Sequence, residues 1–171
     1  MVDRAQSRPI PPAPADVRIA AAVSTYHHDV TGAMFRSAVQ TLKEAGVDAE
    51  RVVEVRVPGA FELPLAAQRL AERGAADAVL CFGLILKGET EHDRHIATAV
   101  AQGLMQVGLE LDTPVHFGVL TCGTLEQAQR RARTLAEGGL DKGREVALAA
   151  IETLRAMHDL AGTNPPIHES R

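Results

Sequence analysis

The feature that most constrains this chain is a regular alternation of short apolar segments with longer segments of helical periodicity. Repeated strand-then-helix patterns are typical of a parallel sheet covered by helices on both faces. We therefore expect an α/β fold, a single-domain three-layer sandwich with a four-stranded parallel sheet, whose ligands bind at the carboxyl ends of the strands. Strands are expected at 17–23, 52–55, 78–86 and 115–120, and helices at 32–45, 61–73, 91–109, from 124 onward and at 143–160.

Length and composition fit one domain. The 171 residues are 46% hydrophobic and 23% charged, and with four Phe, one Tyr and no Trp the core must be built mainly from aliphatic side chains. We expect a Pro-rich N-terminal arm over 1–16, an α/β domain over 17–160 and a polar C-terminal tail over 161–171. The arm should be extended or disordered unless a neighbouring surface holds it.

Charge and cysteine usage exclude several classes of function. A net charge of −4 gives no electrostatic reason to expect a nucleic-acid partner, and the apolar runs are too short to span a membrane. Cys81 and Cys122 lie far apart without C-x-x-C spacing, which favours buried thiols in a reducing cytoplasm. The seven His residues show no metal-ligand spacing, so we expect no metal.

The segment from Phe82 to His92 carries the most informative chemistry. An apolar strand runs into a Gly-containing loop that delivers Thr90 and His92 to the start of a helix. Unpaired N–H groups at a helix N-terminus stabilise an anion, here beside Gly88, Glu89 and Thr90. A histidine side chain one turn further on could move protons next to that anion. The alternative is a capped strand-helix junction with a solvated histidine.

Other motifs follow the remaining expected strands and so converge on the same edge of the sheet. Ser24-Thr25-Tyr26-His27-His28 follows the first strand, and V-P-G-A-F-E-L-P over 57–64 follows the second. The fourth strand lies within P-V-H-F-G-V-L-T at 114–121. It is followed by E-Q-A-Q-R-R-A at 126–132 and then by D-K-G at 141–143.

These motifs, in this order and spacing, resemble the lumazine synthase family of riboflavin biosynthesis over roughly residues 17–158. The resemblance implies a flavodoxin-like fold and a condensation that needs no cofactor. In that family 5-amino-6-(D-ribitylamino)uracil attacks the ketone of 3,4-dihydroxy-2-butanone 4-phosphate, phosphate and water leave, and ring closure gives 6,7-dimethyl-8-ribityllumazine. The family builds its site across subunit contacts in pentamers that sometimes form icosahedral shells, so the resemblance also implies self-association into pentamers or larger assemblies.

The resemblance assigns a role to each matched residue. His92 corresponds to the general acid/base. Phosphate contacts are implied for Glu89, Thr90, Arg131 and Lys142. Contacts to the heterocycle and its ribityl chain are implied for Tyr26, Gly59, Ala60, Phe61, Glu62, Ile85 and Leu86, and for Phe117 of the neighbouring subunit.

Each role has a structural alternative. Tyr26 could cap a strand end, Phe117 could be a core residue, and Glu62 could favour the helix dipole. Arg131 could belong to a solvated helix face, and Lys142 could be an ordinary surface cation. For the whole protein, the alternative is a non-catalytic flavin- or lumazine-binding shell protein of the same fold. A related enzyme that dismutates the lumazine to riboflavin is a third reading.

Two departures from the family pattern concern the site directly. Asp93-Arg94-His95 stands where the family often has an aromatic-Asp-aromatic sequence, so charge replaces apolar bulk after His92. Glu89 adds a carboxylate beside the expected phosphate, which is tolerable only if that side chain points outward.

Overall fold

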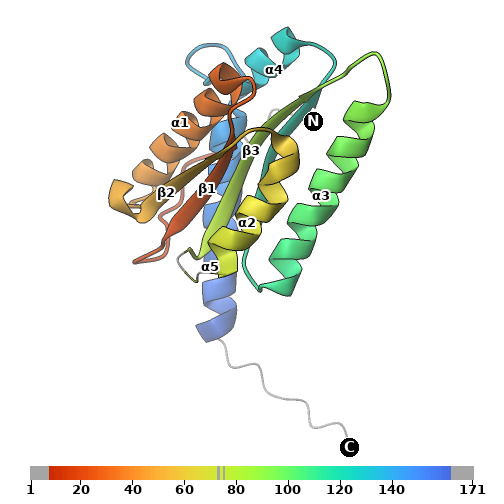
Figure 1. The fold of residues 1–171 in the computed structure, drawn as a ribbon. Helices are drawn as coiled ribbons and strands as arrows, with labels where there is room; N and C mark the ends of the chain where they lie inside the picture. The colour runs from red at the N-terminus through yellow and green to blue at the C-terminus, as the bar shows by residue number, and fades with distance from the viewer. Residues whose placement is uncertain (1–7, 73, 75, 163–171) are drawn as a thin grey trace, which may run out of the picture.

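The computed structural model describes residues 8–72, 74 and 76–162. Its sheet has four parallel strands in the order β2-β1-β3-β4, which confirms the expected α/β fold. Five helices cover the two faces, with α2 and α3 on one side and α1, α4 and α5 on the other (Figure 1). The strands are β1 (Ile19–Ser24), β2 (Val52–Val57), β3 (Ala78–Leu86) and β4 (Val115–Cys122), and the helices are α1 (His28–Glu44), α2 (Leu63–Glu72), α3 (His92–Glu110), α4 (Leu125–Ala132) and α5 (Lys142–Gly162).

The expected elements are present, with some differences at their ends. Helix α1 begins at His28 rather than at 32, because His27 adopts a left-handed backbone with φ of 57° immediately before it. The Thr31 hydroxyl then donates to the Ser24 carbonyl at 2.7 Å, which ties this first turn to the end of β1. Pro64 lies in the first turn of α2, as expected. The expected end of that helix at Arg73 lies outside the described residues.

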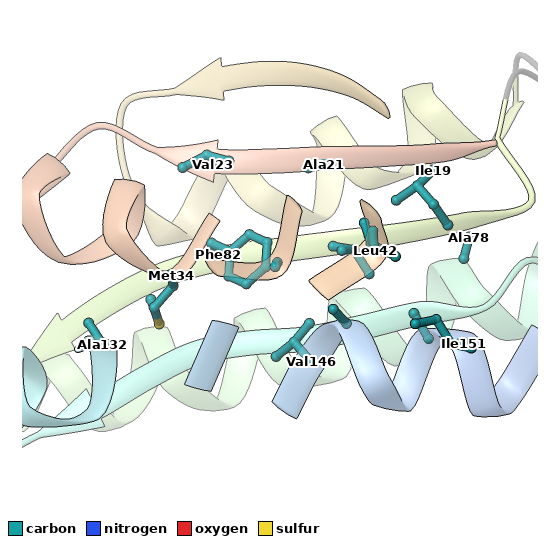
Figure 2. Close-up of a cluster of buried hydrophobic side chains, with 14 of the residues drawn as sticks. Ile19, Ala21, Val23, Met34, Leu42, Ala78, Phe82, Ala132, Val146 and Ile151 are labelled. Carbon is teal, nitrogen blue, oxygen red and sulfur yellow. The ribbon is translucent and has the colours of Figure 1, made fainter. Parts of the chain in front are cut away.

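Small and aliphatic side chains fill the core on both faces of the sheet. Strand β1 is buried along its whole length, and β3 is buried in all but its last residue. On the α1 and α5 side, Phe82 packs edge-on against Phe35 with ring centroids 6.2 Å apart. Figure 2 shows Phe82 among aliphatic side chains from β1, α1 and α5. Because β1 and β3 are central and rigid, the loops at their carboxyl ends start from fixed positions.

The described part of the N-terminal arm lies along its own subunit. Arg144 and Arg155 of α5 donate to the carbonyls of Arg8 and Pro12 at 2.8 and 3.2 Å. The amide of Ala13 donates to the Ala45 carbonyl at 2.9 Å. This segment is therefore held by α5 and by the end of α1. Residues 1–7 of the arm and residues 163–171 of the tail lie outside the described part of the chain.

The D-K-G motif is a packing device at the start of α5. Asp141 has φ of 50°, accepts a hydrogen bond from the Ser37 hydroxyl of α1 and caps Arg144 N at 3.0 Å. A Cβ on Gly143 would lie 2.0 Å from the Met34 carbonyl oxygen, so only glycine lets α5 approach α1 this closely. The same contact fixes the position from which the Lys142 side chain projects.

Gly143→Ala should therefore destabilise the protein by about 3 kcal/mol, with a fall in Tm of ~10 °C, because backbone must move to admit the methyl group. Thermal unfolding at one protein concentration measures the effect. Gly123→Ala is the matched control, since the nearest atom to its added Cβ is 3.5 Å away. Equal Tm values for the two variants would contradict this account of the α1–α5 contact.

Candidate functional site

A cavity of about 350 Å³ opens at the carboxyl end of the sheet, on the face covered by α2 and α3. Its walls come from the loop after β1, the segment after β2, the end of β3 and the first turns of α3. It is the place where the expected motifs of three strands meet. The lining residues are Tyr26, Gly59, Ala60, Phe61, Glu62, Leu84, Ile85, Leu86, Gly88, Thr90, His92, Asp93 and Ile96.

Hydrogen bonds fix the first two loops to each other. The amides of Thr25 and Tyr26 donate to the carbonyls of Val57 and Pro58 at 2.8 and 2.9 Å, so the strand pairing continues into the loops. A Cβ on Gly59 would lie 3.2 Å from the Tyr26 ring. The glycine therefore lets the 57–64 segment close against the aromatic wall of the cavity.

Glu62 has a structural role within the cavity wall. Its Oε2 atom accepts a hydrogen bond from the Gly59 amide at 2.9 Å, which satisfies the backbone N–H at the start of the short 3-10 helix Ala60–Glu62. One carboxylate oxygen is thus engaged by the protein itself. The other remains able to accept a hydrogen bond from a ligand.

Two aromatic side chains give the cavity a broad apolar surface. Tyr26 is 66% exposed and Phe61 is 62% exposed, although both are large and the chain has few aromatics. Exposed rings beside a cavity provide flat faces on which a heterocycle can stack. Tyr26 thus lies where its exposed ring can face a ligand in the cavity.

Thr90 and His92 lie at the N-terminus of α3, as expected. The amide of His92 lies 3.4 Å from the Thr90 hydroxyl oxygen, and α3 begins at His92 itself. Gly88 and Thr90 both line the cavity, whereas Glu89 is exposed outside it. The carboxylate of Glu89 thus stays out of the cavity. The N-terminus of α3 opens toward the cavity.

Besides Glu89, three of the expected site residues are not brought into this cavity. Phe117 pairs with Cys81 in the sheet, so along β4 it lies ~13 Å or more before the level of Ile85 and Leu86. Its ring is 41% exposed, which contradicts a purely core role for it. Arg131 is exposed on α4.

Lys142 is the third of these residues. Its ammonium pairs with Glu145 at 2.7 Å at the start of α5. This ion pair joins residues one helical turn apart and gives Lys142 a partner within its own helix. No Lys or Arg is found among the described residues that line the cavity.

Groups with strongly shifted pKa values lie away from the cavity. Burial raises the pKa of Cys81 to about 12 and lowers the pKa of His116 to about 4. Burial also raises the pKa of Cys122, against the opposing effect of the nearby Arg131 charge. The two thiols are buried, and His116 is partly buried. Within the described residues, no group of His, Cys, Asp and Glu could hold a metal ion.

Sequence reasoning missed some lining residues, of which Asp93 is the most important. It was noted only as a departure from the family, yet it lines the cavity beside His92, as does Ile96. Residues 92, 93 and 96 share one side of a helix, so helical spacing was the signal that could have found them. A larger cavity of about 650 Å³ lies at the opposite end of the sheet and includes none of the expected site residues.

The fold and the cavity define the class of protein: a doubly wound α/β protein with a cavity of small-molecule size at the carboxyl ends of its strands. Comparison with known proteins then gives the family. Residues 16–158 match the family model for 6,7-dimethyl-8-ribityllumazine synthase. The chain belongs to this family.

Individual relatives support the same assignment. A 6,7-dimethyl-8-ribityllumazine synthase of Salinibacter ruber is 41% identical over 85% of this chain and 91% of its own length. One of Thermus thermophilus is 41% identical over 85% of this chain and 90% of its own. 6,7-Dimethyl-8-ribityllumazine synthase 1 of Caulobacter vibrioides is 42% identical over 90% of this chain and 97% of its own. Across residues 8–162, apart from 73 and 75, no helix is long and apolar enough to cross a membrane.

Proposed function

We propose that this protein is a 6,7-dimethyl-8-ribityllumazine synthase. It condenses 5-amino-6-(D-ribitylamino)uracil with 3,4-dihydroxy-2-butanone 4-phosphate and releases phosphate and water in riboflavin biosynthesis. The observation that carries the proposal is the meeting of His92, the α3 N-terminus and two exposed aromatic rings around one cavity. Family membership over residues 16–158 supports the same reaction.

The chemistry assigns His92 to proton transfer. Attack of the amine on the ketone forms an imine and releases water, and the phosphate then leaves by elimination to give a second carbonyl group. Attack of the ribitylamino nitrogen on that carbonyl, with loss of a second water, closes the ring of the lumazine. Each step moves a proton to or from nitrogen, oxygen or carbon, which a histidine at the cavity wall can do. Thr90 and the amides at the start of α3 bind the phosphate. Tyr26 and Phe61 hold the heterocycle.

The backbone of the cavity wall binds the polar parts of the pyrimidine. Gly59, Ala60, Ile85 and Leu86 line the cavity, and their main-chain groups are the donors and acceptors that we assign to the ring edge and the ribityl hydroxyls. Glu62 accepts from the ribityl chain with the oxygen that Gly59 does not use. These backbone groups contribute to recognition of the pyrimidine.

The charge of the cavity supports a site shared between subunits. Its described lining holds carboxylates from Glu62 and Asp93 but no Lys or Arg, which is a poor environment for a phosphate dianion. Arg131, Lys142 and Phe117 lie elsewhere on the subunit. We propose that a neighbouring copy supplies Phe117 and Arg131, with Lys142 as a secondary phosphate contact, in a homopentamer or a larger assembly. Glu89, outside the cavity, contributes its backbone amide only.

The remaining expectations complete the proposal. Two free, buried cysteines are consistent with a cytoplasmic protein. The organisation into an arm over 1–16, a catalytic domain over 17–160 and a tail over 161–171 is part of the same proposal. A non-catalytic lumazine-binding shell protein needs the aromatic faces but has no use for His92. The presence of His92 in the cavity therefore favours the enzyme over the shell protein.

Incubation with both substrates, followed by lumazine absorbance, tests the function directly. His92→Ala should lower turnover ~10²- to 10⁴-fold, with a smaller effect on substrate binding, because a general acid/base acts mainly in the transition state. The exposed His95, which does not line the cavity, supplies the control variant His95→Ala. An unchanged turnover number in an assembled His92→Ala protein would remove His92 from the mechanism.

Arg131→Ala should raise KM for the butanone phosphate by about tenfold or more, because one charge-assisted contact to the phosphate is lost. The KM for the pyrimidine should change little. Arg130→Ala removes an equally exposed charge from the same helix and should leave both constants near their wild-type values. Equal increases in both constants for Arg131→Ala would indicate a structural role for that residue instead.

A further inference from the structure

Asp93 is the residue of the cavity whose role remains to be assigned. It is partly buried, whereas the residues on both sides of it, His92 and Arg94, are exposed. Its neighbour Glu91 pairs with Arg94 at 3.0 Å outside the cavity. Across the described part of the chain, no hydrogen bond or ion pair engages the Asp93 carboxylate.

An aspartate in the first turn of a helix has an ordinary explanation in the helix dipole. That explanation does not require the side chain to line a cavity, and an exposed position such as that of Glu91 satisfies it equally well. Burying part of a carboxylate without a partner costs free energy. A ligand that donates hydrogen bonds to both oxygens would recover that cost.

The two proposed substrates differ in what a carboxylate does to them. The pyrimidine carries N–H and O–H donors on its ring, amino groups and ribityl chain, so it gains hydrogen bonds from an ionised acceptor. The butanone phosphate carries a dianion, which the same carboxylate repels. Within this cavity Glu62 already accepts from Gly59. Asp93 is therefore the cavity carboxylate with both oxygens open to a ligand.

Resting on the proposed function, we propose that Asp93 is a specificity-determining residue. Its carboxylate accepts hydrogen bonds from donors of the ribitylaminopyrimidine and weakens the binding of phosphate in its vicinity. The charge of Asp93 thus favours the pyrimidine over a phosphorylated ligand in the part of the cavity next to it.

Asp93→Asn tests this proposal because it keeps the shape of the side chain and removes its charge. The KM for the pyrimidine should rise about tenfold, since the acceptor loses its charge and one of its two oxygens is replaced by an NH2 donor. Inhibition by inorganic phosphate should strengthen about threefold, since a nearby like charge is removed. A general disturbance of the cavity would weaken both ligands together. Opposite changes are therefore specific to a charge that selects between them.

Two further variants complete the experiment. Glu91→Gln removes the same charge two residues away, outside the cavity, and should leave both constants within about twofold of wild type, because an exposed charge is screened. Asp93→Glu keeps the charge and should retain wild-type inhibition by phosphate. Parallel weakening of both ligands in Asp93→Asn, or equal effects from Glu91→Gln, would overturn the proposal.

Binding of the product, 6,7-dimethyl-8-ribityllumazine, gives a readout without turnover. Its Kd should rise in Asp93→Asn and stay near wild type in Glu91→Gln, as followed by lumazine fluorescence at equal assembly state. An unchanged Kd in Asp93→Asn would overturn the role of Asp93 in an active enzyme. A wild-type protein that neither forms nor binds the lumazine would instead overturn the proposed function itself.

Discussion

The candidate site depends on the parallel pairing of β1 with both of its neighbours. Ser24 is in register with Val57, so β1 and β2 end at one level, whereas β3 continues beyond Phe82, the partner of Val23, to Leu86. The loops after β1 and β2 therefore meet beside the last residues of β3. Parallel strands can end on the same side of the sheet only because α1 and α2 each return the chain to the amino-terminal end of the next strand. The small side chains of β1 let those helices pack closely, and the loops that follow are fixed by hydrogen bonds from Thr25 and Tyr26.

Much of this could be predicted from sequence, because the strands are apolar runs and the motifs after them have strong turn and capping signals. The early start of α1 was missed since the polar residues of its first turn carry no apolar periodicity, and a left-handed His27 is not visible in composition. The three-residue spacing between Gly59 and Glu62 permits a capping contact, but only the structure shows that the Glu62 carboxylate accepts from the Gly59 amide. Asp93 was missed because the resemblance weighted aromatic residues at that position.

The phosphate-binding residues illustrate a different limit. Sequence motifs assign the phosphate-binding residues to one site. On a single chain, however, these residues lie in two separate regions of the surface. His92 and Thr90 lie in the cavity, while Arg131 lies on α4 beside the end of β4. A cavity with carboxylates and without Lys or Arg in its described lining is incomplete for a phosphorylated substrate. In our account, assembly supplies the missing cation and a further aromatic face, so that assembly and activity are linked through the subunit contact.

Complementation between two inactive variants tests this shared site most directly. Phe117→Ala and His92→Ala subunits would be co-assembled from denaturant in equal amounts, and lumazine formation would be compared with each variant alone. Random mixing around a ring places an intact Phe117 beside an intact His92 at about a quarter of the contacts. The account predicts that about a quarter of the wild-type activity returns. Mixed particles that remain as inactive as their parents would contradict it.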